Sequence, residues 1–377
     1  MSSLDIERAV DRYGDEQIEL IKFYRDVALE VDCDPNYIAN NFKNSTLIQD
    51  KMMADFKRSK KDSLSTLNRT VVSESLAYGD CGALLATPSP SLSGALLDEI
   101  GSDDQRAFFR EHVTKTSCRT FFGVTEPDRG SDAANMETKM RGHTLKGEKL
   151  LVGNVGTAGI GTVLFRTEDK FLDMRAAIVT PKQLSSERVK RESLQMFALR
   201  GSNVGYIHFE DLPIDEDMIL GHHLRPMQQG VMSMVQVFNR FRPSVSAMAL
   251  GTAQAIVDHV ESTVDKLDFS DRRQLSLLNE EIALARKLNE KAARQVDKNP
   301  FASTMASLAK MKCCAAAKRV SSVINSILEA NIILFDPWLS KALRDVYAFE
   351  WMEGTSNIHR NNLITGIKRN EFPFLNQ

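Results

Sequence analysis

The hydrophobic and polar positions along this chain change their period twice. From residue 6 to about residue 118, apolar residues recur at the three- and four-residue spacing of amphipathic helices. Within this stretch, residues 66–78 are predicted as one helix that ends at Gly79-Asp80. Ser102 precedes an acidic first turn and is expected to cap another helix. The first part of the chain is therefore predicted to be a bundle of helices.

From residue 120 to about residue 221, the pattern changes to short β-rich runs that alternate with turn residues. Long helical stretches are missing between these runs, which argues against a doubly wound parallel sheet and for an antiparallel sandwich or barrel. The runs predicted as strands are residues 120–124, 149–152, 162–167, 176–180 and 206–209.

Helical periodicity returns at Gln229 and continues almost to the end of the chain, where four long helices are predicted. Pro243 is expected to kink the first of them, and Pro337 to interrupt the pattern before a last helix from about Ser340. The three patterns predict three domains: an N-terminal helical domain at residues 1–118, a central β domain at 119–221 and a C-terminal helical-bundle domain at 222–377.

Composition narrows the class of protein. The chain has 377 residues, of which 42% are hydrophobic and 26% charged, as in ordinary soluble globular proteins. Its 48 Lys and Arg residues nearly balance its 50 Asp and Glu residues, so a formal net charge of −2 gives no overall field to attract nucleic acid. The five cysteines lack CxxC spacing, which argues against a disulfide framework or a zinc site. A cytoplasmic protein without a signal peptide, a membrane span or a metal site is expected.

Three short motifs are candidates for binding or chemistry, and each also has a plain structural interpretation. Residues 125–132 follow a predicted strand as a turn-rich exit, although their Gly-Ser pair is also able to present backbone N–H groups to a cofactor. Glu353, before Gly354, is either a solvated helix-end carboxylate or, if apolar neighbours enclose it, a general base with a raised pKa. Arg242 either forms a surface ion pair or reaches a carboxylate or anion.

A set of motifs spread over the chain has a recognisable order: Val124-Thr125-Glu126-Pro127, Gly130-Ser131-Asp132, Arg200-Gly201-Ser202, Arg242-Pro243, residues 306–310 and residues 353–360. From about residue 66 to residue 367, this set resembles the acyl-CoA dehydrogenase family. The resemblance implies an α+β multidomain fold with an α-helical N-terminal domain, a central antiparallel β domain and a C-terminal four-helix bundle. It also implies FAD between the β and C-terminal domains and against a neighbouring subunit, and thus a homodimer or homotetramer.

The resemblance implies an FAD-dependent oxidoreductase that acts on the CH–CH bond of an acyl thioester. Glu353 matches the family's base, which removes a proton from the α-carbon while the β-hydrogen leaves as hydride to flavin N5. Some members carry the base directly before the Arg-Pro pair, where this chain has Phe241. By position, the residues expected to bind the cofactor are Val124, Thr125, Ser131, Thr355 and Asn357, and those expected to bind the substrate are Ser131, Arg242 and Gly354.

Two segments depart from the family pattern. Leu151-Val152-Gly153 replaces the family's Trp-Ile-Thr beside the flavin, and Glu329-Ala330 replaces its Gly-Gly pair at the adenine side of FAD. In this respect the chain looks more like divergent members that act on carrier-protein-bound acyl or aminoacyl groups in polyketide and nonribosomal peptide biosynthesis. One similar case is the dehydrogenase of aminomalonyl extender formation in colibactin-type pathways. A carrier-protein substrate in secondary-metabolite biosynthesis is therefore expected.

Several alternatives stay open at this point. The thioester carrier is a carrier protein or coenzyme A, and the electron acceptor is an electron-transfer flavoprotein or oxygen. The alternative functions are a fatty or branched-chain acyl-CoA dehydrogenase and a non-catalytic scaffold that retains the fold. The basic residues Lys57, Arg58, Lys60 and Lys61 would suit an acidic helix of a carrier protein, although a solvated face is the plainer explanation.

Overall fold

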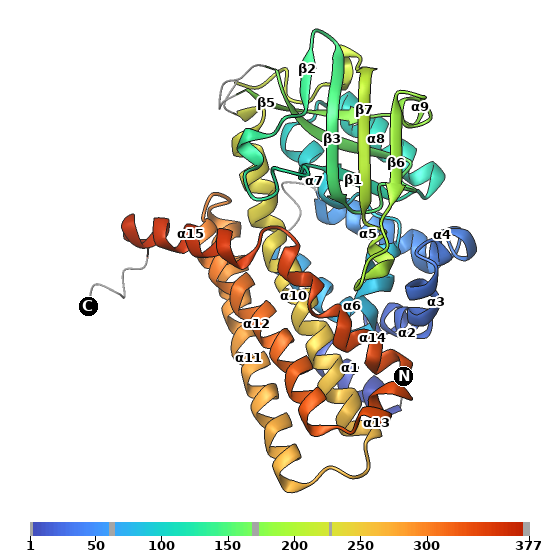
Figure 1. Ribbon diagram of the computed structural model, residues 1–377, viewed down its shortest axis with the longest axis vertical. Helices are drawn as coiled ribbons and strands as arrows, with labels where there is room; N and C mark the ends of the chain where they lie inside the picture. The colour runs from blue at the N-terminus through green and yellow to red at the C-terminus, as the bar shows by residue number, and fades with distance from the viewer. Residues whose placement is uncertain (1–2, 60–64, 168–172, 226–227, 372–377) are drawn as a thin grey trace.

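The structure is a computed structural model that describes residues 3–59, 65–167, 173–225 and 228–371. Figure 1 shows the strands gathered at one end of the molecule, with the long C-terminal helices extending from them to the opposite end. The N-terminal helices lie beside both parts. The predicted α+β order of helices, strands and helices along the chain is confirmed.

The first part of the chain is helical, as predicted. The Ser102 cap is confirmed, because its hydroxyl accepts a hydrogen bond from the Gln105 N–H and the Gln105 side chain accepts one from the Ser102 N–H. The helices of this part are α1 (Ser3–Tyr13), α2 (Ile18–Asp26), α3 (Ala28–Cys33), α4 (Tyr37–Asn41), α5 (Thr46–Ser59), α6 (Thr66–Ala86), α7 (Ser91–Ile100) and α8 (Asp103–Thr116).

The predicted end of a helix at Gly79-Asp80 corresponds to a break in α6, which resumes after it and continues to Ala86. Asp80 has φ −164° and ψ 126°, so the helix is broken at this residue and then resumes. Arg25 donates hydrogen bonds to the carbonyl oxygens of Tyr78 and Gly79 at 2.9 and 2.8 Å. These bonds satisfy carbonyl groups beside the break, so a local interruption takes the place of a helix end.

All five predicted strands are present, with bounds that differ from the predicted ones by at most five residues. The pattern does not predict β2 or β6. β2 is very short, and β6 contains a single apolar residue, Val189, because it lies at the edge of the sheet, where charged side chains are exposed to solvent. The strands are β1 (Thr120–Gly123), β2 (Lys139–Arg141), β3 (Thr144–Val152), β4 (Ile160–Arg166), β5 (Met174–Val179), β6 (Val189–Ser193) and β7 (Gly205–Pro213).

The sheet is mixed, which corrects the expectation of a purely antiparallel β domain. Its strand order is β1-β4-β2-β3-β7-β6, and β5 also pairs with β4. The pairs β2–β3, β3–β7, β4–β5 and β6–β7 are antiparallel, whereas β1 and β2 run parallel to β4. The β2–β3 hairpin lies between β1 and β4 in the sequence. After this hairpin the chain enters β4 running in the same direction as β1. Residue periodicity within short strands does not encode this pairing.

Among the described residues, the C-terminal part has three long helices rather than the predicted four. They are α10 (Val231–Thr263), α11 (Phe269–Lys298) and α12 (Ser303–Ile327). The long helix α6 packs along α10, where a Cβ atom on Gly251 would lie 2.2 Å from the Glu74 carbonyl oxygen. α6 also contacts α11, so a helix from the first part of the chain packs against the long C-terminal helices.

Shorter helices follow α12. Pro337 begins a helix instead of only interrupting one, because a residue in the first turn needs no N–H partner and Asp336 caps this turn by accepting the Leu339 N–H at 2.8 Å. The last predicted helix therefore begins before Ser340. Pro243 lies inside α10, which continues to Thr263. The elements are α13 (Ala330–Leu334), α14 (Pro337–Asp345), the 3-10 helix η5 (Ala348–Trp351) and α15 (Ser356–Lys368).

In the part of the chain that the structure describes, no helix combines the length and the apolar character that a membrane span requires, and no group of His, Cys, Asp and Glu side chains suits a metal ion. Of the predicted basic run, Lys57 is exposed on α5, whereas Lys60 and Lys61 lie outside the described residues. The three domain boundaries and the cytoplasmic location stay predictions.

Candidate active site

The centre of the candidate site is the turn between η5 and α15. Glu353 has φ +50° and Gly354 has φ +107°, so two consecutive residues lie in the left-handed region of backbone conformation. Gly354 adopts this region freely, whereas a residue with a side chain adopts it at a cost of about 1–3 kcal/mol that its surroundings must offset. Contacts from other elements therefore have to hold Glu353 in place.

Two cationic side chains from different helices hold this turn. Arg242, on α10, donates a hydrogen bond from Nε to the Glu353 carbonyl oxygen at 3.1 Å. Lys310, on α12, is 1% exposed and donates from Nζ to the carbonyl oxygens of Phe349 at 2.7 Å and Gly354 at 3.4 Å. The backbone before, at and after Glu353 is thus tied to the helical bundle.

The Glu353 carboxyl group is enclosed, and one of its oxygens is left without a hydrogen bond. The residue as a whole is half-buried, but its Oε2 is shielded from solvent and receives no hydrogen bond from any described residue. Burial raises the pKa of Glu353 to about 7, against the lowering effects of Lys310 and Arg242. A carboxyl group with this pKa exchanges its proton near neutral pH, as a general base requires.

Arg242 is itself fixed by its neighbours. Its Nη1 donates to Asn239 Oδ1 at 2.6 Å, and Asn239 Nδ2 donates to the Pro300 carbonyl oxygen at 2.8 Å. Asn239 is fully buried, so this chain of hydrogen bonds is protected from water. Burial lowers the pKa of Arg242 to about 10, an effect that Glu353 opposes. The guanidinium group therefore stays charged at neutral pH and keeps its orientation.

His359 packs against the turn as a neutral side chain. A Cβ atom on Gly354 would lie 3.2 Å from His359 Cε1, so the imidazole and the glycine are in close contact. Burial, together with the charges of Arg242 and Lys310, lowers the pKa of His359 to about 3. The imidazole is therefore uncharged at physiological pH and adds no third positive charge beside Glu353.

Glu126, in the Thr-Glu-Pro motif, has a structural role. Its Oε1 lies 2.8 Å from Nζ of Lys149, a fully buried residue of β3. The same Nζ donates to the Val124 carbonyl oxygen at 3.2 Å, and the Thr125 carbonyl oxygen accepts the Leu150 N–H at 2.8 Å. Burial lowers the pKa of Lys149 to about 8, against the effect of Glu126. The ion pair fixes the exit of β1 against β3.

The residues predicted to bind the cofactor lie in two places. Val124 is buried and Thr125 half-buried at the exit of β1, and Ser131 is exposed in the loop that follows. Thr355 is the N-cap residue of α15 and its hydroxyl makes no capping hydrogen bond, while Asn357 is exposed in the first turn of that helix. Their roles stay predictions.

Two of the three residues predicted to bind the substrate adjoin the candidate base. Arg242 bonds to the Glu353 carbonyl oxygen, and Gly354 is its neighbour in the chain. No hydrogen bond between described residues joins Ser131 to them. The structure thus assembles Arg242, Glu353 and Gly354 and leaves Ser131 in an exposed loop.

Lys310 and His359 are residues of this site to which the sequence assigned no role. A signal for Lys310 exists, because it lies among apolar residues of α12 that are buried, such as Ala306, Ala309 and Cys313. A cation on an apolar helix face requires buried acceptors. Which acceptors these are depends on how α12 packs against the turn before α15, and the sequence does not show it.

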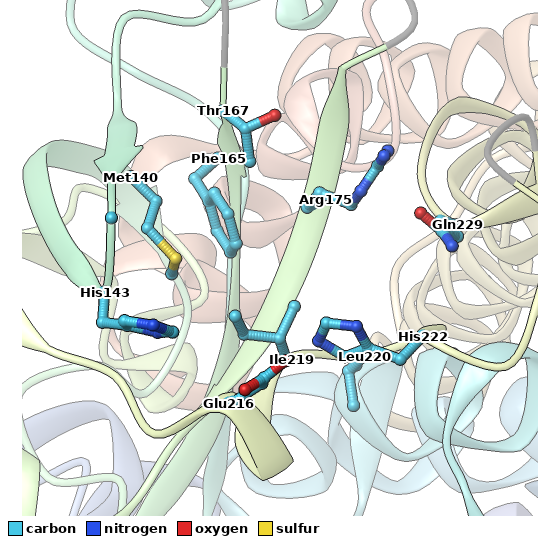
Figure 2. Close-up of a pocket in the computed structure, with 11 residues that line it drawn as sticks. Met140, His143, Phe165, Thr167, Arg175, Glu216, Ile219, Leu220, His222 and Gln229 are labelled. Carbon is cyan, nitrogen blue, oxygen red and sulfur yellow. The ribbon is translucent and has the colours of Figure 1, made fainter.

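A cavity of about 160 Å³ lies in the β part of the molecule and is separate from this site. Figure 2 shows Met140 and His143 on one side of it and Gln229 on the other, with Phe165 and Arg175 between them. None of the predicted site residues lines it. The candidate active site is therefore identified by the geometry around Glu353 and not by this cavity.

Two segments of the chain match models of acyl-CoA dehydrogenase domains. Residues 121–212 match the acyl-CoA dehydrogenase middle domain, and residues 228–368 match the acyl-CoA dehydrogenase C-terminal domain. The chain is also 25% identical, over 317 residues, to the probable medium-chain specific acyl-CoA dehydrogenase 2, mitochondrial, of Caenorhabditis briggsae. That match covers 79% of this chain and 75% of the relative.

Solved structures show the same fold. The FAD complex of PigA has a TM-score of 0.78 at 16% identity, with 94% of this chain and 98% of that chain covered. The prolyl acyl carrier protein oxidase AnaB has a TM-score of 0.76 at 18% identity, with 94% and 99% covered. The two matched domains together span more than half of this chain and include Arg242 and Glu353. The chain belongs to the acyl-CoA dehydrogenase family.

Proposed function

We propose that this protein catalyses the FAD-dependent α,β-dehydrogenation of an acyl thioester, with Glu353 as the base, on a carrier-protein-bound acyl or aminoacyl group of secondary-metabolite biosynthesis. The observation that carries the proposal is the Glu353 carboxyl group: it is enclosed, has a free Oε2, and has a pKa raised to about 7. This combination suits proton abstraction from a carbon atom and has no evident structural purpose.

The chain's own residues account for the proton transfer. In its ionised form, Glu353 accepts the α-proton at Oε2, which has no competing hydrogen bond from a described residue. Arg242 and Lys310 hold the backbone on both sides, so the carboxylate keeps its position while it gains the proton. His359 is neutral and therefore adds no positive charge beside the Glu353 carboxylate. The negative charge that develops on the thioester carbonyl requires nearby donors, and the resemblance to the family implies the Glu353 N–H as one of them.

The residues around the site fit a flavin cofactor. At the end of β3, Leu151 has φ +56°, which is unusual for a leucine, and its 51% exposed side chain is free to cover a ring system. The Thr355 hydroxyl is not used for capping and is free to bind a ligand. Val124, Thr125, Ser131, Thr355 and Asn357 would hold the cofactor. When bound, FAD supplies the acceptor for the hydride that leaves the β-carbon.

The identity of the molecule that carries the acyl group is the more specific part of the proposal. A carrier-protein thioester is supported by the fold shared with a prolyl acyl carrier protein oxidase and by the atypical residues at 151–153 and 329–330. A homo-oligomer and an electron-transfer flavoprotein or oxygen as electron acceptor are part of the same proposal. Coenzyme A as the carrier is the alternative that the experiment has to exclude.

The test is anaerobic reduction of the purified, flavin-loaded protein. An acyl thioester should bleach the visible flavin spectrum. The flavin should be reduced faster when the acyl group is carried by a carrier protein than when coenzyme A carries the same group. A colourless protein that FAD does not reconstitute would contradict the enzymatic proposal and favour a scaffold. Faster reduction by the coenzyme A thioester would contradict only the carrier-protein part.

The rate of flavin reduction in the wild-type protein should rise with pH through about 7, because only ionised Glu353 accepts a proton. Lys310→Met should move this rise to higher pH. The charge of Lys310 lowers the pKa of Glu353, so the carboxyl group keeps its proton to higher pH when this charge is removed. Stopped-flow reduction measured across the pH range gives the midpoint of the rise.

Lys312→Met is the matched control for this experiment, because Lys312 is exposed on the same helix. It should leave the pH midpoint where it is in the wild type. A purely structural role of Lys310 would lower the rate at every pH without moving the midpoint. An unmoved midpoint in Lys310→Met is therefore the result that contradicts the prediction.

A further inference from the structure

One buried lysine joins two segments that are predicted to lie beside the cofactor. Lys149 lies on β3, two residues before Leu151. Its Nζ donates a hydrogen bond to the Val124 carbonyl oxygen at 3.2 Å, at the exit of β1. The Thr125 carbonyl oxygen also accepts a hydrogen bond from β3, from the Leu150 N–H at 2.8 Å. Both predicted cofactor residues at the exit of β1 are therefore held by β3.

The Lys149 side chain has a fixed position. It is fully buried, and a Cβ atom on Gly123 would lie 3.3 Å from its Cγ, so the aliphatic part of the side chain packs closely on β1. Besides the Val124 carbonyl oxygen, Nζ has Glu126 Oε1 at 2.8 Å and Met136 Sδ at 3.6 Å as acceptors. These acceptors match the three N–H donors of an ammonium group.

Glu126 is anchored by bonds that do not depend on Lys149. Its Oε1 accepts the Thr138 N–H at 2.9 Å, and its Oε2 accepts the Glu137 N–H. Burial acts to raise the pKa of Glu126, but Lys149 and these hydrogen bonds hold it below its ordinary value. Because burial lowers the pKa of Lys149 only to about 8, both groups are charged at neutral pH. Glu126 is thus a fixed anion that orients the ammonium group toward the exit of β1.

We propose that Lys149 is a positioning residue for the cofactor: its ammonium group, oriented by Glu126, fixes the Val124-Thr125 backbone for flavin binding, and its charge favours the reduced flavin. This inference rests on the proposed function, which assigns FAD to these residues. A buried ion pair rarely stabilises a fold more than apolar residues of similar volume would, so fold stability alone does not account for the pair. In a water-excluded site, a fixed cation acts strongly on a cofactor that takes up electrons.

The test uses Lys149→Met, which removes the ammonium group and keeps most of the length of the side chain. Titration of the apoprotein with FAD, followed by flavin fluorescence, should give a dissociation constant about tenfold or more above that of the wild type, the effect expected when a hydrogen bond from a charged donor is lost. The reduction potential of the FAD bound to this variant should be lower than in the wild type.

A second variant separates positioning from fold stability. Lys149→Met leaves Glu126 buried without its cation, which destabilises the fold by itself. The double variant Lys149→Met/Glu126→Gln has neither charge, so denaturant unfolding of its apoprotein should show that much of the lost stability returns. Its affinity for FAD should stay low, because the Val124 carbonyl oxygen still lacks the Lys149 donor.

Lys146→Met is the matched control, because Lys146 lies on the same strand in an exposed ion pair with Glu210. It should leave the FAD affinity and the reduction potential unchanged. An affinity or a potential like that of the wild type in Lys149→Met would overturn the inference, as would an affinity that returns together with the stability in the double variant. If the wild-type apoprotein does not bind FAD at all, the proposed function fails instead.

Discussion

Glu353→Gln is expected to slow flavin reduction by an acyl thioester by about 10²–10⁴-fold, the usual contribution of a general base. The amide has almost the shape of the carboxyl group but is unable to take up the α-proton. The contacts that hold this turn run to backbone carbonyl groups, from Arg242 and Lys310, so the substitution leaves them in place. The flavin should therefore stay bound, and anaerobic stopped-flow spectroscopy should show an oxidised spectrum that the thioester no longer bleaches.

Glu350→Gln provides the matched control, three residues earlier in the chain. Against the raising effect of burial, hydrogen bonds with Lys318 and Ser356 lower the pKa of Glu350 to about 2, so it is a poor base at neutral pH. The side-chain amide oxygen in this variant would still accept the Ser356 N–H, and most of the rate should be kept. Undiminished reduction in Glu353→Gln excludes Glu353 as the base, and loss of the flavin in that variant would assign its carboxylate to cofactor binding.

The candidate base was proposed from the sequence through the family resemblance, and its motif is local. Glu353, Gly354 and Thr355 are consecutive, and the structure places Arg242 against them as the order of motifs suggests. The environment that sets the pKa of Glu353 was not predictable. It combines burial, which raises the pKa, with the charges of Lys310 and Arg242, which lower it, and both result from the packing of elements that are distant in the sequence.

The same distinction holds for the fold. The Ser102 cap and the five predicted strands depend on neighbouring residues and are confirmed. The continuation of α6 beyond Gly79-Asp80 depends on Arg25 and Lys341, which come from other helices. The parallel pairing of β1 with β4 depends on the path of the intervening hairpin. Features set by tertiary partners are the ones that hydrophobic periodicity misses.

A buried ion cluster illustrates how strongly such tertiary partners act. Nζ of Lys341, on α14, lies 2.6 Å from Asp80 Oδ2 and 2.7 Å from Asp345 Oδ2, and all three side chains are almost completely buried. Asp80 occupies the break in α6, and Asp345 Oδ1 accepts the Leu199 N–H at 2.7 Å. The cluster therefore joins α6, α14 and the segment before β7.

Lys341→Met should lower the free energy of unfolding by roughly 3–5 kcal/mol, because it leaves buried carboxylates without their cation. Denaturant unfolding followed by tryptophan fluorescence measures the difference from the wild type. The matched control is Lys22→Met, which breaks an exposed ion pair with Glu19 and should cost less than about 1 kcal/mol. Similar small losses in both variants would contradict the prediction.

The loss in Lys341→Met should also shrink as the pH falls. Burial raises the pKa of Asp345 above its ordinary value even with Lys341 beside it, and removal of the cation raises it further. A carboxyl group whose pKa is higher in the folded state binds protons more tightly when folded, so folding gains stability as the pH decreases toward the unfolded-state pKa. Protonation then removes the unpaired charge that the substitution creates. A loss that stays constant between neutral and acid pH would instead show that packing, and not charge, is what Lys341 contributes.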